Sequence, residues 1–167
     1  MRLVIVFAIV LSALSAKSQS FFYCVDTTRV PNDYQPCGTD FSPVCGCDNK
    51  TYRNECAAYF WGGLFSGSWT YSTICEGFFM EMYPTAVSYF PATFNLYMKQ
   101  PGPASLYIYD DFGRFKYQRN FYATYAGQII SEEIPVDNLD LGIYMLVVVA
   151  AGDKQTVKFA KVTDIEN

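Results

Sequence analysis

Six cysteines are the residues of this 167-residue sequence whose types and spacing could do chemistry, either by forming disulfides or by binding a metal. They cluster in the first half of the chain, at Cys24, Cys37, Cys45, Cys47, Cys56 and Cys75. An even set of clustered cysteines behind an export signal predicts a disulfide framework. Six cysteines can pair in many ways, and spacing alone does not choose between them.

The sequence contains no histidine, which removes the usual general base and the usual nitrogen ligand of a metal site. The Cys45-x-Cys47 pair therefore favours disulfides over a metal ion, and we expect no cofactor. Ser-His and Cys-His catalytic pairs are also impossible, so we expect no enzyme activity. The 12 basic and 16 acidic residues give a net charge of −4 without a basic cluster, which argues against a nucleic-acid partner.

Short elements must position these cysteines. Asn54 is a suitable N-cap for a helix over residues 55–61, which Gly62 and Gly63 would end. Residues 50–52 and 68–72 are candidate short strands. A module this small buries little apolar surface, so it depends on its disulfides for stability.

Residues 1–20 have the pattern of a signal peptide, with Arg2 followed by an apolar run from Leu3 to Leu14 and then small residues. The run is shorter than the roughly 20 residues that span a bilayer. We therefore expect the signal to be removed, no membrane span in the mature chain, and a secreted or cell-surface location.

The cysteine-rich segment, about residues 22–77, resembles a Kazal-type serine protease inhibitor domain. The resemblance is carried by two blocks, Pro43-Val44-Cys45-Gly46 and Thr51-Tyr52-Arg53-Asn54-Glu55-Cys56. Tyr59 stands where the standard pattern has a cysteine, and Cys47 is additional, as in a Gly-Cys-Asp variant of the family. The resemblance implies three disulfides: Cys37–Cys56, Cys45–Cys75 and Cys24–Cys47.

In that family a rigid loop enters a serine protease in the manner of a substrate. The resemblance places this loop at Gly38, Thr39, Asp40 and Phe41, with Thr39–Asp40 as the reactive bond. Thr39 would enter the primary specificity pocket and Phe41 would make an apolar contact on the leaving side. Asn54 and Pro43 would support the loop. Because threonine is small and uncharged, we expect an extracellular elastase-like or subtilisin-like protease as the partner.

The second half of the chain alternates apolar and polar residues between turns. Candidate strands cover residues 93–98, 104–109, 114–118, 128–134, 142–150 and 155–162. Short strands at this spacing predict an all-β antiparallel sandwich of the immunoglobulin-like kind. The expected domains are therefore a signal peptide (1–20), a small disulfide-rich α+β Kazal module (21–77) and a β-sandwich (78–167).

Residues 80–167 are similar to the type A C-terminal sorting domain of type IX secretion. The matching segments are Tyr83-Pro84, Asp111-Phe112-Gly113-Arg114, the block from Leu139 to Val147, and the final strand from Val157 to Val162. This resemblance implies that the outer-membrane secretion machinery is a second partner.

Two alternatives remain open. The Kazal fold could act as a non-inhibitory surface module for adhesion or protein contact. Tyr107, Tyr109, Tyr122 and Tyr125 could line a sugar-binding face, although at alternating spacing they are more often part of ordinary strand packing. The predicted function is a secreted Kazal-type inhibitor exported by its C-terminal domain.

Overall fold

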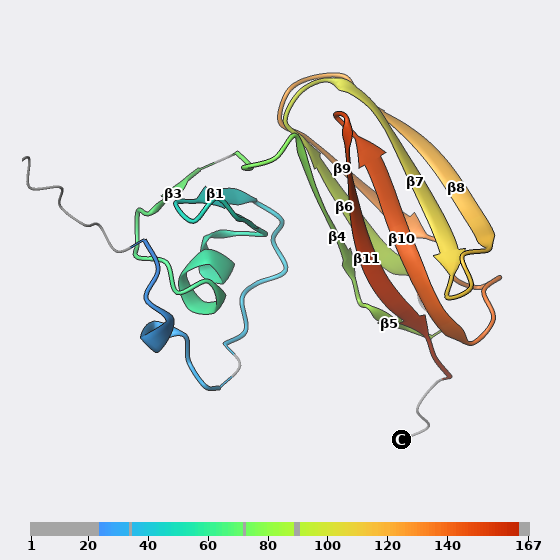
Figure 1. Ribbon diagram of the computed structural model, residues 1–167, viewed down its shortest axis with the longest axis horizontal. Coiled ribbons are helices and arrows are strands. Elements are labelled where there is room, and N and C mark those ends of the chain that lie inside the picture. The colour runs from blue at the N-terminus through green and yellow to red at the C-terminus, as the bar shows by residue number, and fades with distance from the viewer. Residues whose placement is uncertain (1–23, 34, 72, 89–90, 164–167) are drawn as a thin grey trace, which may run out of the picture.

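The computed structural model describes residues 24–33, 35–71, 73–88 and 91–163 (Figure 1). The predicted signal peptide lies outside these residues. The chain forms a small N-terminal part, here called the disulfide module (residues 24–75), and a larger β-rich region (residues 78–163), which lie beside one another (Figure 1). Within the described ranges, no helix is long and apolar enough to cross a membrane.

The disulfide module consists of very short elements. In chain order these are η1 (Thr27–Arg29), β1 (Val44–Gly46), β2 (Thr51–Tyr52), the helical turn η2 (Ala57–Trp61) and β3 (Trp69–Thr70). The strands form an antiparallel sheet in the order β2-β1-β3. The module's core is small, with Val44, Ala58, Leu64 and Trp69 as its buried members. Covalent bridges must therefore supply much of its stability.

The turn between β1 and β2 and the end of the helical turn form for local reasons. Asn49 adopts φ 60°, a left-handed conformation that asparagine tolerates, between β1 and β2. The hydroxyl of Tyr52 donates to the Asp48 carboxylate at 2.8 Å, and burial together with this bond raises the pKa of Tyr52. After η2 the chain turns at Gly63, whose φ is +68°.

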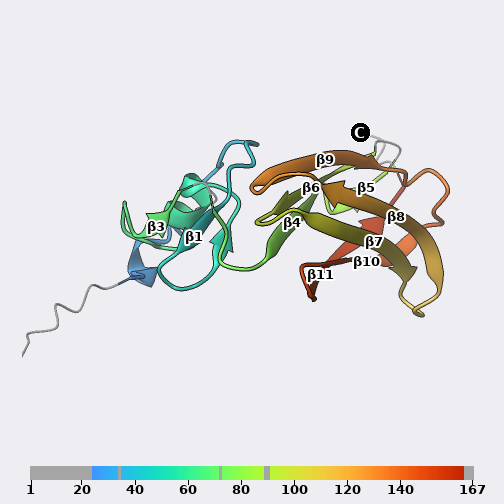
Figure 2. The same ribbon diagram turned by 90° about the horizontal axis from the view of Figure 1, so that it is seen from above.

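The β-rich region consists of two antiparallel sheets that lie face to face (Figure 2). Its strands are β4 (Phe78–Tyr83), β5 (Ala86–Val87), β6 (Ala92–Met98), β7 (Gly102–Asp110), β8 (Phe115–Ala123), β9 (Gln128–Ile134), β10 (Gly142–Ala150) and β11 (Asp153–Lys161). One sheet has the order β4-β6-β9, and the other has the order β5-β11-β10-β7-β8. β5 is the exception to antiparallel pairing, because it runs parallel to β11.

A single apolar core joins the two sheets. It contains side chains from β4, β6, β7, β10 and β11, including the fully buried Phe78, Phe94, Leu106, Leu146 and Phe159. Along β4 and β7 every second residue is buried, so each strand has one inward and one outward face. The outward face of β4 is the one that concerns the candidate site below.

Six strands match the expected segments within a few residues, and three differences remain. β4 and β5 were not predicted, and β8 extends to Ala123 instead of ending near residue 118. β4 was missed because its residues are mostly apolar, which obscures the period of two. β5 contains only two residues and pairs with a distant strand. The antiparallel character of the sheets is confirmed, while the immunoglobulin-like topology stays a prediction.

Asp110 fixes the hairpin between β7 and β8. Its side chain is 5% exposed, and it accepts hydrogen bonds from the backbone of Phe112 at 3.0 Å and Arg114 at 2.9 Å. The Arg114 guanidinium lies 2.6 Å away and the Lys116 ammonium 3.5 Å away. Burial by itself raises the pKa of Asp110, but these donors and the Arg114 charge together lower it below its ordinary value.

Replacing Asp110 by Asn should therefore destabilise the chain most at neutral pH. The ionised Asp110 stabilises the folded state above its unfolded pKa, about 3.9, and that stabilisation is lost as the pH falls through the lower folded pKa. The difference in unfolding free energy between Asp110→Asn and the wild type should thus shrink below about pH 4. Denaturant unfolding from pH 2 to 7 measures it, with the exposed neighbour Asp111→Asn as the control. A difference that does not change with pH would contradict this role.

Candidate functional site

The loop between Cys37 and Cys45 is held covalently at both ends. The structure contains three disulfides, and they are the pairs that the family resemblance implies: Cys24–Cys47, Cys37–Cys56 and Cys45–Cys75. Their Cα–Cα distances of 5.8, 5.5 and 4.9 Å lie in the usual range. Each bridge is worth about 2–4 kcal/mol, chiefly by restricting the unfolded chain.

Asn54 connects this loop to the helical turn. Its side chain is buried, at 3% exposure, and its Nδ2 donates to the carbonyl oxygens of Gly38 at 3.4 Å and Asp40 at 3.1 Å. Its Oδ1 accepts from the backbone N–H of Ala57 at 2.9 Å, which caps the first turn of the helix. One buried amide therefore positions carbonyls on both sides of the Thr39–Asp40 bond.

The bond itself is exposed. Gly38, Thr39 and Asp40 are all solvent-accessible, although their backbone is held from behind by Asn54. A Cβ at Gly38 would lie 2.9 Å from the Asp40 carboxylate, so a side chain there would require that carboxylate to move. The predicted support residue Pro43 is buried. The segment therefore combines an accessible peptide bond with a backbone in which several groups are fixed.

Arg53 is a loop contact that the sequence analysis did not identify. Its Nη2 donates to the carbonyl oxygen of Thr39 at 3.0 Å, and its own carbonyl accepts from the backbone N–H of Ser42 at 3.0 Å. The same Nη2 lies 3.3 Å from the carboxylate of Glu81 in β4. Its position next to Asn54 was a weak signal that Arg53 reaches the loop, whereas nothing in the spacing indicated Glu81.

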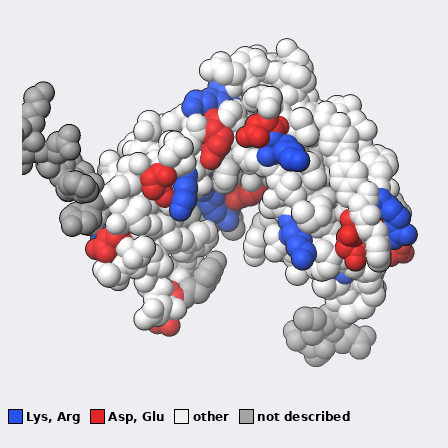
Figure 3. Space-filling view, viewed as in Figure 1, with Lys and Arg blue, Asp and Glu red and all other residues white. Residues whose placement is uncertain are grey.

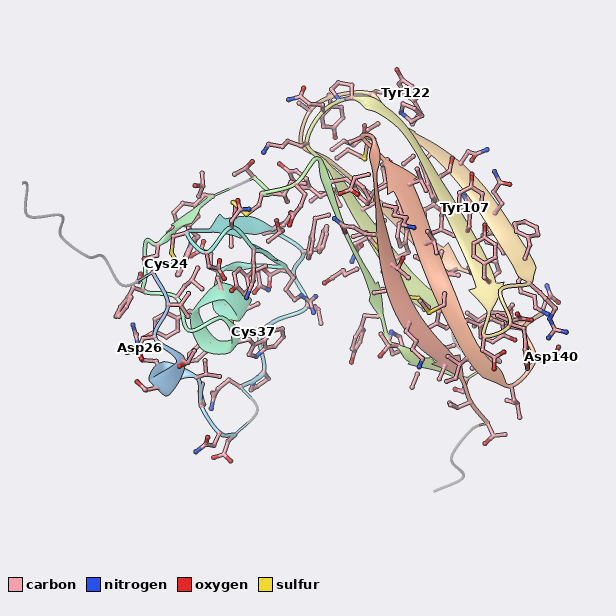
Figure 4. All side chains as sticks on the ribbon, viewed as in Figure 1. Cys24, Asp26, Cys37, Tyr107, Tyr122 and Asp140 are labelled. Carbon is pink, nitrogen blue, oxygen red and sulfur yellow. A yellow bond between two sulfur atoms is a disulfide. The ribbon has the colours of Figure 1, made fainter. Side chains whose placement is uncertain are left out.

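Phe41 does not project freely into solvent. Its ring is half-buried and stacks on Phe79 of β4, with ring centroids 5.9 Å apart and planes 7° apart. Within the chain, the apolar partner of Phe41 is thus Phe79, and its contact with a protease stays a prediction. Cys37, at the start of the loop, lies on the side of the disulfide module that faces the β-rich region (Figure 4).

The contact between Arg53 and Glu81 is partly desolvated, with the two side chains 18% and 17% exposed. Burial raises the pKa of Glu81 above its ordinary value, while the Arg53 charge and a hydrogen bond from Asn95 lower it by less. Desolvation of the carboxylate therefore affects the pKa of Glu81 more than the Arg53 charge does.

The tyrosines proposed for a sugar face do not form one platform. Tyr107 stacks on Tyr109, with centroids 6.3 Å apart, on the outer face of the β10-β7-β8 sheet. Tyr122 lies on β8 at the other end of that strand pair, as Figure 4 shows, and Tyr125 follows in the loop after β8. Within the part of the chain that the structure describes, no group of histidine, cysteine, aspartate or glutamate side chains is arranged to hold a metal ion.

Comparisons with known proteins address this same segment. Residues 24–58 match the Kazal-type serine protease inhibitor domain family. A 38-residue stretch is 47% identical to "Serine protease inhibitor Kazal-type 1-like" of Rattus norvegicus, covering 23% of this chain and 48% of that protein. A 33-residue stretch is 52% identical to "Trypsin inhibitor ClTI-1" of Gallus gallus, covering 20% of this chain and 53% of that protein.

The chain thus spans about half the length of the curated relatives it matches. The match supports a Kazal-type serine protease inhibitor domain at residues 24–58, within the disulfide module. This family is one of inhibitors and not of enzymes, which agrees for this segment with the expectation drawn from the lack of histidine. The β-rich region remains unassigned, because the match ends at residue 58.

Two substitutions at Asn54 should separate its two roles. Asn54→Ala removes both the loop donor and the helix cap and should cost about 2–3 kcal/mol of unfolding free energy. Asn54→Asp keeps an oxygen acceptor for the Ala57 N–H but replaces the amide donor with a charge beside the Gly38 and Asp40 carbonyls. It should loosen the loop alone, so that amide hydrogen exchange accelerates over residues 38–42 but not at Ala57. Equal acceleration at both places would show that the two contacts are not separable.

Proposed function

We propose that the disulfide module inhibits an extracellular serine protease by presenting the Thr39–Asp40 bond as a substrate-like loop. The single observation that carries this proposal is the contact of buried Asn54 with the carbonyls of Gly38 and Asp40, while the bond between them is exposed. The match of residues 24–58 to a family of serine protease inhibitors supports it.

The mechanism is occlusion without net chemistry by the inhibitor. The protease would bind Gly38 to Phe41 as it binds a substrate and could cleave the Thr39–Asp40 bond. The Cys37–Cys56 and Cys45–Cys75 bridges would keep both new ends in place, so resealing would compete with release of the leaving segment. The loop backbone is already ordered by Asn54, which lowers the entropy cost of binding.

Thr39 sets the class of protease. Its side chain has no charge to pair with the aspartate of a trypsin-like pocket, and it is too small to fill a chymotrypsin-like slot. A small-pocket protease, elastase-like or subtilisin-like, suits it best. One relative is a trypsin inhibitor by name, whereas Thr39 favours a different target for this chain.

The parts on either side of the Kazal-like domain (residues 21–77) would direct export. Residues 1–20 would act as a signal peptide. Residues 78–167 would act as an immunoglobulin-like type IX sorting domain that engages the outer-membrane secretion machinery. The nine-residue strands β10 and β11, joined at Ala151 and Gly152, support the sorting-domain proposal because that resemblance includes a Gly-centred terminal hairpin. The mature protein would be secreted or held at the cell surface.

A non-inhibitory surface module is the second candidate. The observation that favours it is the stacking of Phe41 on Phe79, because a loop used for protease binding would normally leave that side chain free. In this reading the module and the β-rich region form one body that serves adhesion or protein contact.

Thr39→Lys in the oxidised full chain should discriminate between the two candidates. A lysine at the reactive position can pair with the aspartate of the trypsin pocket, so the affinity for trypsin should rise by about a hundredfold. Inhibition constants against trypsin, elastase and subtilisin measure the effect. Thr70→Lys, which places the same charge on an exposed threonine of β3, is the matched control. No inhibition by wild type or variant at high micromolar concentration would support the non-inhibitory candidate.

A further inference from the structure

The β-rich region is attached to the disulfide module almost without a linker. Only Glu76 and Gly77 separate Cys75, which is disulfide-bonded into the module, from the first residue of β4. The backbone N–H of Lys99 donates to the Gly77 carbonyl at 3.1 Å, and the Lys99 ammonium donates to the Ile74 carbonyl at 2.9 Å. These contacts fix the direction in which β4 leaves the module, and with it the face of the sheet that the loop meets.

That face is the outer side of the β4-β6-β9 sheet. We call Phe79, Glu81, Tyr97 and Ile129 the cover face; Phe79, Tyr97 and Ile129 lie side by side across the three strands. Tyr97 is only 7% exposed although it points away from the sandwich core. Gly127, in the loop between β8 and β9, lies against its ring, because a Cβ there would be 3.3 Å from the Tyr97 hydroxyl.

The end of the loop between Cys37 and Cys45 borders the cover face. Ser42 and Pro43 face Tyr97, Gly127 and Ile129 across an open groove of about 380 Å³. The Phe41 ring stacks on Phe79 beside that groove. Figure 3 shows the two parts of the molecule meeting at a junction with charged side chains, with a notch in the surface beside it.

These contacts occupy the side of the loop that a protease would need. A substrate-like loop fills the protease cleft on both sides of the reactive bond, and Phe41 lies two residues beyond that bond on the leaving side. A protease that accepts Phe41 must take the place of Phe79. The β-rich region lies on this same side of the loop, so it would overlap sterically with a bound protease.

A second contact acts on the reactive bond itself. In a serine protease the carbonyl of the attacked residue receives hydrogen bonds from the oxyanion hole. Here the Thr39 carbonyl already accepts from Arg53, whose guanidinium is held 3.3 Å from the Glu81 carboxylate. The Arg53 donor therefore competes with the oxyanion hole for the acceptor sites of the Thr39 carbonyl.

We propose that the cover face masks the leaving side of the protease-binding loop, so that the intact chain is a restrained inhibitor whose full affinity appears when the β-rich region moves off the loop. This inference rests on the proposed inhibitory function. The occupant of the cover face is the chain's own segment 41–43, which a bound protease displaces.

The double variant Phe79→Ala/Glu81→Gln in the oxidised full chain tests the mask without altering the loop. Both side chains lie on the outer face of β4, so the sandwich core is retained. The affinity for subtilisin or elastase should rise by about tenfold, because binding no longer requires the two contacts to be broken.

The matched control is Phe115→Ala/Glu132→Gln, which truncates an exposed ring on β8 and neutralises the Glu132 carboxylate that pairs with Arg119. Glu81→Gln alone, nearly identical in shape, serves if the double variant is unstable.

Three inhibition results are distinguishable. A tighter complex for the cover-face variant but not for the control supports the mask. Equal or weaker inhibition by the cover-face variant overturns the mask and leaves the inhibitory function standing, because the β-rich region then supports the loop or does not affect it. No inhibition by any chain overturns the inhibitory function itself.

Amide hydrogen exchange tests in that last case whether the cover face restrains the loop, because the measurement needs no protease. Exchange over residues 38–43 should be about tenfold faster in the cover-face variant than in the control. Unchanged exchange would overturn the mask independently of any inhibition assay.

Discussion

The Cys45–Cys75 disulfide is the constraint on which the rest of the structure depends. Cys45 ends the exposed loop and lies in the central strand β1, while Cys75 is the last disulfide-bonded residue before β4. One bond therefore fixes the end of the loop, the middle of the small sheet and the point where the chain enters the β-rich region. Without it the small core around Val44 and Leu64 would have little to oppose the entropy of the open chain.

The loop geometry follows from this bond together with one buried amide. Asn54 has to satisfy its own donors and acceptor once it is buried, and the nearest groups are the carbonyls of the loop and the first free N–H of the helix. The loop is thus ordered by the same contacts that begin the helix. The order of the loop and the start of the helix thus depend on different atoms of one side chain, Nδ2 and Oδ1.

Much of the disulfide module could be predicted from sequence. The Asn54 cap is a local feature, whereas the pairing of the cysteines followed from the family resemblance and not from their spacing. Most strands of the β-rich region could be predicted as well, because one face of each is buried and the period of two is visible. β4 could not, since Phe78, Phe79, Met80 and Met82 are apolar on both faces. Phe79 is apolar on the outer face because it packs against Phe41.

The contacts between the two parts could not be predicted at all. Glu81 and Arg53 are ordinary surface residues in the sequence, and no spacing rule states which exposed side chains of two domains will meet. Their encounter depends on the direction in which β4 leaves Gly77, and that direction is set by the Lys99 contacts in three dimensions. The Phe41–Phe79 stack has the same origin, so its effect on the loop appears only in the folded chain.

The short connection between Cys75 and β4 also determines how a mechanical load would travel through the molecule. A pull between the loop and the β-rich sheets passes from β4 through Glu76 and Cys75 directly across the sulfur–sulfur bond to Cys45. Residues 46–74, with the helical turn and two of the three small strands, lie outside this force path. Covalent bonds over a few residues would therefore carry the tension. The disulfide module would stay folded while force is applied between the loop and β4.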